Sequence, residues 1–406
     1  MIDLNLLDEG FFQFLKEYKD ENYSDLLLKK TGDILTPEAK KYAALQIRAR
    51  KLLHGKIDRI LENDRFLIPD LLVAEQASNE NVASYNASLV YRSDRVVDLT
   101  AGLGIDVICF SRNSREVVAV EKDEWRSTML RYNLKELKIN NVEICNGDAE
   151  TFLESSNETY DVIYLDPSRR DANGGRIYRL EECEPDVVSL FPVLKSRCRR
   201  LLIKASPLLD LKETERLISN LQCIHIVEYK RECKEILIEV DFTKNDCTLP
   251  EINCVFVRSY DDFEIFQIPP QTLIEKLYLN SHEDIKDGLY IYEPAPSLLK
   301  SGKSDIVFKL DESLRKLDTN TNLFCSEKFI MNFPGRIFEV QKRLTHKDYK
   351  SLKNGCYNVV ARNHPLKADK LIKKYFIKPG GDEYLLAFRA CDKPVIIIAK
   401  DGRQLS

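Results

Sequence analysis

VVDLTAGLG at residues 96–104 and VIYLDPSRR at residues 162–170 are the two stretches that indicate the fold of this chain. Each is an apolar run with the composition of a buried strand, and each reaches an aspartate, Asp98 or Asp166, just before it breaks into a turn. Parallel strands present ligand-binding groups at their carboxyl ends in this way. Two such strand ends in one domain predict a shared ligand crevice.

The composition is that of a folded protein with a large core. The chain has 406 residues, 44% of them hydrophobic, with only 15 glycines and 15 prolines. Because no window approaches the length of an apolar membrane span, and the first residues lack the pattern of a secretion signal, we expect a cytoplasmic protein with no membrane partner. The 11 cysteines are scattered without any C-x-x-C spacing, so neither a disulfide framework nor a metal site is expected.

Charge is distributed unevenly along the chain. The formal net charge is −4, but residues 325–406 hold 17 Lys or Arg against 8 Asp or Glu, which gives +9 there and −13 for residues 1–324. A basic terminal module on an acidic body predicts a polyanionic partner that meets this module. A lysine-rich face that is merely solvated is the alternative.

Hydrophobic spacing divides the first half of the chain in two. Residues 1–90 have the spacing of amphipathic helices, with a helix N-cap at Ser78-Asn79. Residues 91–245 alternate apolar strand-like runs with helical stretches such as 124–137 and 185–199, which predicts an α/β fold with a doubly wound parallel sheet. The last two strands are too close for a crossover helix and should form an antiparallel hairpin. The expected strands are 96–99, 117–121, 142–146, 162–166, 201–204, 224–228 and 236–240.

The second half shows a different rhythm. Residues 246–320 predict a small α+β unit, with a short hairpin at 255–258 and 263–267 and a helix from 297 to about 300. A polar segment at 318–322 resembles a linker, and residues 321–406 form the basic module. In that module we expect strands at 337–341, 358–362, 384–389 and 395–400, a helix near 367–375 and a turn at 379–382.

Three further groups suggest a nucleotide-like ligand in the crevice. Gly102 and Gly104 let the backbone approach a ligand closely, although a tight turn alone would also explain them. Glu121 ends the second strand, where a carboxylate can accept both hydroxyls of a ribose, or simply begin a solvated helix. Asp148 follows the third strand, where it can accept a hydrogen bond from an adenine amine or cap the next helix.

Over residues 91–242 the chain resembles the class I S-adenosylmethionine-dependent methyltransferases. The resemblance implies a Rossmann-like sheet of seven strands and S-adenosylmethionine as cofactor. It assigns the glycine loop to the methionine part, the end of strand two to the ribose and the turn after strand three to the adenine, and it brings Gln76 over the cofactor. The cofactor residues that it implies are Asp98, Thr100, Ala101, Gly102, Gly104, Glu121, Lys122, Asp148, Ala149 and Gln76.

The DPSRR loop occupies the place of the fourth motif of amino-nitrogen methyltransferases. In that family the aspartate carboxylate and the following carbonyl hold the acceptor amine in line with the methyl group, which here implies Asp166 and Pro167. Ser168 replaces the second proline of the motif and Arg169 replaces its aromatic residue, which leaves the acceptor open. Arg169 and Arg170 can contact the substrate or pair with nearby acids. Lys204 and Ser206, after the next strand, can contact substrate or shape their loop.

The basic module has a resemblance of its own. The sequence from Asn358 through Arg362 and Asn363 to the turn at 379–382 looks like the THUMP-like domain of bacterial methyltransferases that carry the same DPSRR loop, and there a ferredoxin-like unit precedes it. THUMP domains belong to tRNA-modifying enzymes, which implies RNA contacts by Arg362 and Asn363 and favours tRNA as the substrate. Methylation of a protein or small-molecule amine, and an inactive RNA-binding protein, are the alternatives. The sequence does not indicate an oligomeric state.

Overall fold

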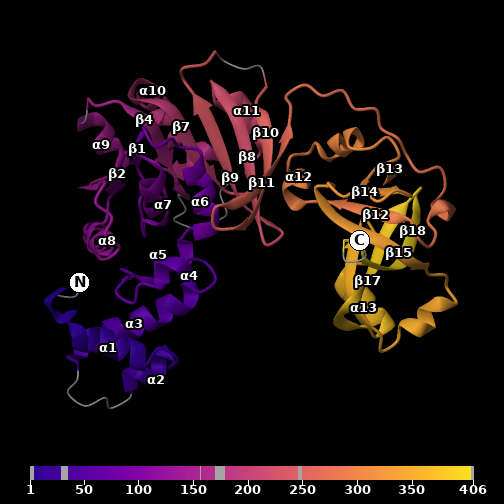
Figure 1. The fold of residues 1–406 in the computed structure, drawn as a ribbon, viewed down its shortest axis with the longest axis horizontal. Helices are drawn as coiled ribbons and strands as arrows, with labels where there is room; N and C mark the ends of the chain where they lie inside the picture. The colour runs from indigo at the N-terminus through magenta and orange to yellow at the C-terminus, as the bar shows by residue number, and fades with distance from the viewer. Residues whose placement is uncertain (1–3, 29–34, 156, 170–178, 246–248, 404–406) are drawn as a thin grey trace. The chain divides into compact units, whose positions relative to one another are not determined.

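The computed structural model describes residues 4–28, 35–155, 157–169, 179–245 and 249–403. The chain divides into two compact units (Figure 1). The first unit comprises Met1–Lys230 with Lys234–Ile265, and the second comprises Arg231–Cys233 with Phe266–Ser406.

Helices dominate the first 90 residues, as their spacing predicts. One group of their side chains, including Phe11 and Tyr42, packs with Met129. Another group, including Leu53 and Ala74, shares a hydrophobic core with Val96 of the first strand. The helices therefore pack as one body with the sheet. They are η1 (Leu4–Leu6), α1 (Glu9–Glu17), α2 (Tyr23–Leu28), α3 (Pro37–Leu53), α4 (Asp58–Leu61), α5 (Leu71–Gln76) and α6 (Glu80–Ser88).

A nine-stranded sheet forms the centre of the first unit. Its order is β11-β10-β8-β9-β7-β4-β1-β2-β3, with β1 parallel to both β2 and β4. Each of the seven strands expected between residues 96 and 240 is present. The strands are β1 (Arg95–Asp98), β2 (Glu116–Glu121), β3 (Val142–Asn146), β4 (Tyr160–Leu165), β7 (Cys198–Ala205), β8 (Leu221–Tyr229), β9 (Glu232–Asp241), β10 (Glu251–Ser259) and β11 (Asp262–Ile268).

The predicted hairpin is confirmed as β8 and β9. Lys230 and Arg231 connect the two strands, and both have left-handed backbone angles, with φ of 50° and 65°. Such a pair of residues makes the tight turn that matches the twist of an antiparallel hairpin. Strand β9 then runs antiparallel to β7, with Leu201 opposite Val240.

Two strands extend the sheet beyond the seven that the resemblance implies. β10 and β11, expected in a separate unit at 246–320, instead belong to this sheet, with β10 parallel to β8. The reason is burial: Val255 and Val257 of β10 form one apolar cluster with Val227 of β8 and with Val82 and Tyr85 of α6. The expected boundary after residue 245 is therefore wrong, because the apolar face of β10 is covered here.

The helices that connect the strands begin with side-chain caps. Asp123, Asp186 and Asp210 each accept hydrogen bonds from backbone amides in the first turn of the helix that follows. None of the described helices is long and apolar enough to cross a membrane. These elements are α7 (Ile105–Asn113), α8 (Glu124–Glu136), α9 (Ala149–Ser155), α10 (Val187–Arg197) and α11 (Leu211–Leu217), together with the short strands β5 (Ser168–Arg169) and β6 (Cys183–Glu184) and the 3₁₀ helix η3 (Leu180–Glu182).

The second unit contains a seven-stranded sheet in the order β13-β14-β12-β15-β18-β17-β16. The strands are β12 (Tyr290–Pro294), β13 (Arg315–Asp318), β14 (Thr321–Ser326), β15 (Gly335–Arg343), β16 (Cys356–Arg362), β17 (Lys378–Ala390) and β18 (Lys393–Asp401). The helices are η4 (His282–Asp284), α12 (Pro296–Lys300), η5 (Ser304–Lys309), η6 (Asp348–Leu352) and α13 (Ala368–Tyr375).

Two expectations about this unit are wrong. The polar segment at 318–322 is the tight turn between β13 and β14, and since β12 pairs with both β14 and β15, one sheet runs across the boundary expected at 320/321. The turn expected at 379–382 lies inside β17 as a bulge, where pairing with β16 jumps from Pro379 to Tyr384. Gly380 and Gly381 have φ of 113° and 87°, which explains their turn-like composition.

Candidate active site

A cavity of about 560 Å³ opens at the carboxyl ends of β1, β2 and β4 and beside the turn after β3. Parallel α/β sheets bind ligands at this edge. The end of α5 and the loops that follow the strands form its walls. Of the residues singled out from the sequence, those that line it are Gln76, Thr100, Ala101, Gly102, Gly104, Glu121, Lys122, Asp148, Ala149, Asp166, Pro167 and Ser168.

The two aspartate-ended strands are joined through one hydroxyl group. Asp98 is 1% exposed and does not line the cavity; its Oδ1 accepts hydrogen bonds from the Thr100 amide (2.8 Å) and the Thr100 hydroxyl (3.2 Å). The Thr100 hydroxyl oxygen accepts a hydrogen bond from the amide of Asp166 (2.7 Å). Asp98 thus supports the cavity wall from behind and fixes the loop after β1 against the loop after β4.

The glycine loop requires its glycines. Gly102 and Gly104 have φ of 55° and 84°, which side chains disfavour. A Cβ on Gly104 would lie 2.2 Å from Cδ1 of Leu130 in α8. The loop is thus a tight turn, the alternative that the sequence left open, and it also forms the wall of the cavity.

Glu121 holds this loop against the end of β2. Its Oε2 accepts a hydrogen bond from the Gly102 amide and its Oε1 accepts one from the Asp123 amide, both at 2.9 Å. Each carboxylate oxygen has a second lone pair, so Glu121 can still accept ligand hydroxyls. Lys122, also expected to contact the cofactor, pairs with Glu184 of β6 at 2.9 Å.

Asp148 lines the cavity and caps a helix. Its Oδ1 accepts a hydrogen bond from the amide of Thr151 (2.7 Å) in the first turn of α9. That backbone hydrogen bond lowers the pKa of Asp148 below its ordinary value. The side chain is exposed and ionised at neutral pH, so it remains able to accept a hydrogen bond. Ala149 next to it is buried.

Lys204 does not line the cavity. It lies behind Asp166 and binds the Asp166 carboxylate. Its side chain is only 12% exposed, and its Nζ donates to Oδ2 of Asp166 (2.7 Å) and to the Ser78 hydroxyl (2.6 Å). Burial alone would lower the pKa of Lys204, but Asp166 and the nearby Asp106 and Glu235 raise it above its ordinary value. Lys204 is therefore a buried cation that orients the carboxylate of Asp166.

A cluster of buried acids surrounds this lysine, and the sequence patterns did not single it out. Asp106 accepts hydrogen bonds from the Ser78 hydroxyl (2.5 Å) and the Asn86 amide group (3.2 Å), and lies 3.7 Å from Nζ of Lys204. Glu235 lies 3.8 Å from the same nitrogen, and burial raises its pKa to about 7. The available signal was a charged residue within an apolar run: Asp106 stands in IDVICF at residues 105–110.

The other acceptor-side residues have local partners. The Ser168 hydroxyl donates to the carbonyl of Glu184 (3.2 Å), and the backbone of Arg169 pairs with Cys183 in the short sheet of β5 and β6. Ser206 does not line the cavity; its hydroxyl accepts a hydrogen bond from the Leu208 amide (3.3 Å) and shapes the turn after β7. Arg170 lies outside the described residues.

Arg362 and Asn363 have structural partners within the second unit. Nε of Arg362 donates to Oε1 of the buried Glu293 (2.6 Å). Asn363 adopts a left-handed conformation, with φ of 51°, and its side-chain amide donates to the Thr321 hydroxyl (3.0 Å). These contacts tie the end of β16 to β12 and β14.

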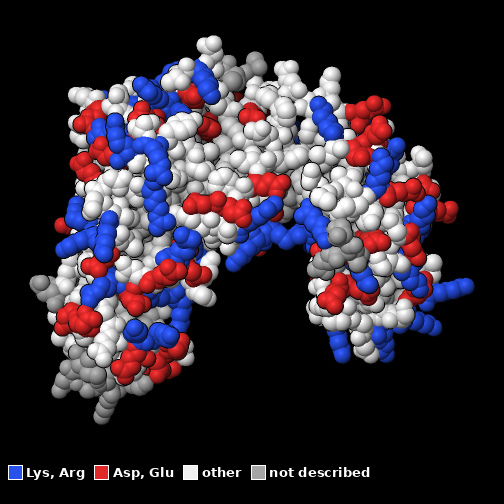
Figure 2. All heavy atoms as spheres, in the orientation of Figure 1, with Lys and Arg blue, Asp and Glu red and all other residues white. Residues whose placement is uncertain are grey.

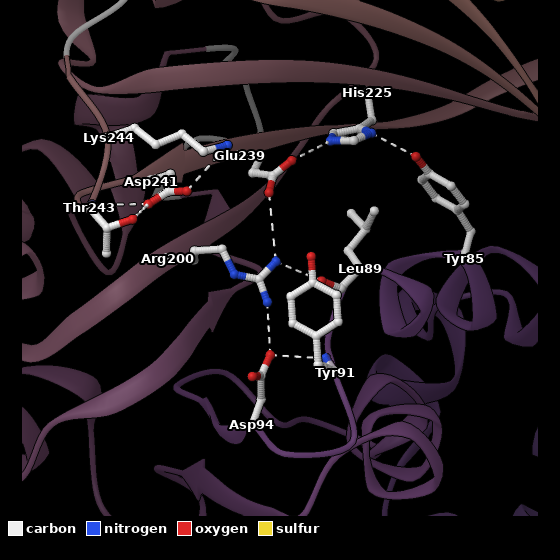
Figure 3. A network of polar contacts seen from close by, with 10 residues as sticks. All are labelled: Tyr85, Leu89, Tyr91, Asp94, Arg200, His225, Glu239, Asp241, Thr243 and Lys244. Atoms are coloured by element: carbon white, nitrogen blue, oxygen red, sulfur yellow. Dashed lines mark hydrogen bonds and ion pairs between the residues drawn. The ribbon is translucent and has the colours of Figure 1, made fainter.

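One group of side chains in the first unit has the composition of a metal site. Ligand atoms of Cys223, His225 and Glu239 lie within 4.8 Å of one another. Both ring nitrogens of His225 are already engaged, however: Nδ1 with the Tyr85 hydroxyl (2.6 Å) and Nε2 with Glu239 (3.2 Å) (Figure 3). The group is therefore part of a polar network that connects α6 with β8 and β9.

Three family matches follow one another along the chain. Residues 79–174 match a family described as "Conserved hypothetical protein 95", residues 290–334 a ferredoxin-like domain, and residues 335–401 a family described as "THUMP domain-like". The ferredoxin-like match begins after β10 and β11, in agreement with their place in the first sheet.

One relative matches the whole chain and others match part of it. A crystal structure of a Porphyromonas gingivalis W83 protein, provisionally assigned to the methyltransferases, matches with a TM-score of 0.85 and 26% identity over 99% of each chain. A 23S rRNA (uracil(1939)-C(5))-methyltransferase from Vesicomyosocius okutanii is 27% identical over 171 residues, which are 41% of this chain and 35% of the relative.

A second curated relative is the ribosomal RNA small subunit methyltransferase J of Francisella philomiragia, 26% identical over 163 residues, which are 36% of this chain and 63% of the relative. The chain thus spans between about a third and just under two thirds of the length of these two curated relatives. The strand order and the full-length structural relative show that the first unit has the fold of a methyltransferase domain, and the family matches show that ferredoxin-like and THUMP-like domains follow it.

Proposed function

We propose that this protein is an S-adenosylmethionine-dependent methyltransferase that modifies an exocyclic base amine of RNA, with tRNA the favoured substrate. The observation that carries the proposal is that Asp166 and Pro167 line the same cavity as Gly102, Glu121 and Asp148. Cofactor groups and acceptor groups thus share one crevice.

The cavity suits an adenosine-type cofactor with a polar tail. Apolar side chains, among them Val73, Leu103 and Val120, form part of its wall, while Glu121 and Asp148 supply carboxylates for hydroxyl and amine groups. The left-handed Gly102 and Gly104 expose backbone at the end of β1. When bound, S-adenosylmethionine supplies an electrophilic methyl group on a sulfonium.

On the acceptor side, the residues of this chain position an amine. Asp166 accepts a hydrogen bond from the amine of the base, and the Pro167 carbonyl accepts the second, which directs the nitrogen lone pair toward the methyl group. Lys204 engages Oδ2 of Asp166 (2.7 Å) and keeps the carboxylate in place. Ser168 follows Pro167 directly and also lines the cavity. Orientation and electrostatics suffice for this transfer, since no strong base is required.

RNA as the substrate is supported by three features. The curated relatives are named as methyltransferases of ribosomal RNA, and residues 335–401 match the THUMP-like family. Residues 325–406 carry a formal charge of +9, from 17 basic and 8 acidic residues. A basic module of this kind binds phosphates without sequence preference and leaves the choice of nucleotide to the cavity.

Calorimetric binding of S-adenosylmethionine tests the cofactor assignment. Asp98→Ala frees the loop after β1 and Glu121→Ala removes the group that holds Gly102, so both variants should bind the cofactor more weakly than the wild type. Glu62→Ala, an exposed acid of the N-terminal helices, is the control and should bind normally. Wild-type affinity in both site variants would contradict the assignment.

Radiolabelled methyl transfer to bulk RNA tests the acceptor. The wild type should label RNA, with most of the label in the tRNA fraction, whereas Asp166→Ala should still bind the cofactor and transfer little. Label confined to the ribosomal RNA fraction would replace tRNA by rRNA as the substrate. Label in added protein and none in RNA would contradict the RNA proposal.

A further inference from the structure

Helix α13 of the second unit ends in an unusual residue. Phe376 caps it in the left-handed conformation, with φ of 54° and ψ of 43°, and its amide donates hydrogen bonds to the carbonyls of Ile372 and Lys373. Helices commonly use glycine at this position because a Cβ is strained there, and bulky residues are rarely found in it. Folding alone would favour glycine or asparagine over phenylalanine at this residue.

The phenylalanine ring is exposed to solvent. Phe376 is 66% exposed, whereas Leu371 and Ile377 on either side of it are buried in the small core of α13. Among the described residues from 335 to 403, Phe376 is the single exposed large hydrophobic side chain. Its ring therefore contributes little to the core, although its backbone is strained.

Basic residues flank this ring in the sequence, and one of them lies beside it in space. Nζ of Lys353 lies 5.8 Å from the ring centroid, and the carbonyl of Phe376 accepts a hydrogen bond from the Asn354 amide (3.0 Å), so the loop after η6 lies beside the end of α13. Residues 347–378 contain nine Lys or Arg and two Asp, a formal charge of +7. Figure 2 shows basic side chains projecting from the lower part of the second unit, where Figure 1 places α13.

Several of these lysines have no acidic partner. The exposed Lys353, Lys370, Lys373 and Lys374 take part in none of the ion pairs formed among the described residues. By contrast, Lys342 in the same domain pairs with Asp348 at 2.7 Å. These exposed lysines of α13 and the loop beside it are thus available to an external anion.

We propose that Phe376 is a stacking platform for an unpaired base of RNA, with Lys353, Lys370, Lys373 and Lys374 contacting the phosphates on either side. The inference rests on the proposed function in that it takes RNA as the partner. Proteins bind single-stranded RNA with aromatic rings and nearby basic side chains, because every base can stack on a ring and every nucleotide carries a phosphate. A protein partner would instead require a cluster of apolar side chains, which the described residues around Phe376 lack.

The test compares two RNA probes with the full-length protein. One probe is a single-stranded 16-nucleotide oligoadenylate, and the other is an RNA duplex of the same length. Phe376→Gly should weaken binding of the single strand roughly 5- to 150-fold, the range that loss of one stacked base produces, and should leave duplex binding unchanged. Phe376→Tyr, which keeps the ring, should bind like the wild type.

Salt dependence and stability separate stacking from other effects. Phe376→Gly should leave the slope of log affinity against log salt unchanged, because no phosphate contact is lost, whereas Lys373→Gln with Lys374→Gln should reduce it. Phe376→Gly should also raise the melting temperature of the domain, or leave it unchanged, since it relieves the left-handed strain. Leu273→Gly, at a side chain that is 98% exposed elsewhere in the second unit, controls for surface changes in general.

The outcomes distinguish this inference from the proposed function. Equal binding of the single strand by the wild type and Phe376→Gly, or binding of the duplex alone, would overturn the stacking platform and leave RNA as the partner. Failure of the wild type to bind either probe would count against both. A loss of affinity accompanied by a lower melting temperature would overturn the inference, because Phe376 would then serve the fold.

Discussion

Gly104 shows how one residue can decide whether the cavity wall forms. Its φ of 84° is a conformation that side chains disfavour, and an added Cβ would lie 2.2 Å from Cδ1 of Leu130, so the Leu130 side chain would have to shift. We expect Gly104→Ala to reduce the free energy of unfolding by about 1–3 kcal/mol and to weaken cofactor binding, because the left-handed backbone is strained and the buried Leu130 must repack. Urea unfolding followed by the fluorescence of Trp125, the single tryptophan of the chain, measures the first effect, and calorimetry the second.

Gly147 offers a matched control for this prediction. It also lines the cavity, but a Cβ added there would meet nothing within 4 Å, and its backbone is not left-handed. Gly147→Ala should therefore unfold like the wild type. Equal stability of Gly104→Ala and Gly147→Ala would contradict the steric argument.

Glu235 makes stability depend on pH. Burial raises the pKa of Glu235 from 4.5 to about 7. Between these two pH values the folded protein keeps a proton on Glu235 that the unfolded chain has lost. The stability contributed by protonated Glu235 is therefore fully present below pH 4.5 and is lost as the pH rises through 7. Glu235→Gln removes this dependence and should gain up to about 3 kcal/mol relative to the wild type between pH 4.5 and pH 8. Urea unfolding at both pH values gives the difference.

Other groups do not obscure this measurement. Burial raises the pKa of Asp98 to about 8, but Asp98 titrates in both proteins, so the difference between them reports Glu235 together with its coupling to Lys204. Glu62→Gln, at an exposed position, should follow the pH dependence of the wild type. Parallel pH profiles for Glu235→Gln and the wild type would show that Glu235 is ionised as easily in the folded protein as in the unfolded one.

At the scale of elements, Arg200 of β7 joins three parts of the first unit (Figure 3). It donates to the carbonyl of Leu89 (2.7 Å) and to Asp94 (2.8 Å), lies 3.7 Å from Glu239 of β9, and stacks on Tyr91 at 4.9 Å. The side chains of Arg200 and Asp94 are only 14% and 10% exposed. The network therefore connects the segment between α6 and β1 to the middle of the sheet.

Replacing this arginine should be costly. Arg200→Met leaves the buried carboxylate of Asp94 without a cation, although the Tyr91 amide still donates to it (2.9 Å), and should lower the free energy of unfolding by roughly 3–5 kcal/mol. Arg199→Met, at the neighbouring residue, is the control. Arg199 forms an ion pair with Asp161 at 3.5 Å, but the Arg199 side chain is 74% exposed. Loss of this ion pair should therefore lower the free energy of unfolding by less than about 1 kcal/mol. Trp125 fluorescence in urea reports both variants, and equal losses would mean that burial of the Arg200 network contributes nothing.

The positions of helices and strands were predictable from the sequence wherever the spacing of hydrophobic residues alone decides them. All seven strands between residues 96 and 240 and the helices at 124–137 and 185–199 are present within a few residues. The role of β10 was not predictable, because an apolar run such as Ile252–Val257 needs a cover, and its sequence does not say which surface supplies it. The prediction of a linker at 318–322 was wrong for a similar reason, because polar residues are as common in a tight turn as in a linker.

At the scale of the whole molecule, the uneven charge predicts how the proposed binding of RNA should depend on salt. If about four phosphates are neutralised, log affinity should fall against log salt with a slope of about −3. Filter binding of tRNA by the full-length chain between 50 and 200 mM salt, a range that reveals this effect, measures the slope. A flat response would contradict phosphate binding and favour a protein or small-molecule acceptor.

Variants that lose lysine charges show which part of the molecule causes the salt dependence of RNA binding. Exchange of Lys367, Lys370, Lys373 and Lys374 for glutamine should flatten the slope, because these lysines lie in or next to α13 of the basic module. Exchange of Lys40, Lys41, Lys135 and Lys138, which lie in the first unit, removes the same charge and should change the slope less. The same slope in both variants would mean that net charge, and not the basic module, governs binding.

The candidate site was predictable in its outline and not in its interior. The residues that line the cavity follow strand ends, and a parallel sheet brings strand ends together whatever the rest of the chain does. Lys204 was expected as a substrate contact, yet it lies behind Asp166 with Asp106 and Glu235 around it. The burial and pairing of these four charged residues could not be predicted, because they come from segments that are far apart in the sequence and meet only after folding.

The sequence by itself determined the order of strands and helices, the glycine loop, the acids at the strand ends and the basic module, since each depends on local period, backbone freedom or composition. The tertiary structure alone decided that β10 and β11 complete the first sheet, that one sheet spans the second unit, and that Lys204 orients Asp166. The physical reason is that these features depend on which apolar faces cover one another and which charges lose their water together, and residues far apart in the chain settle both.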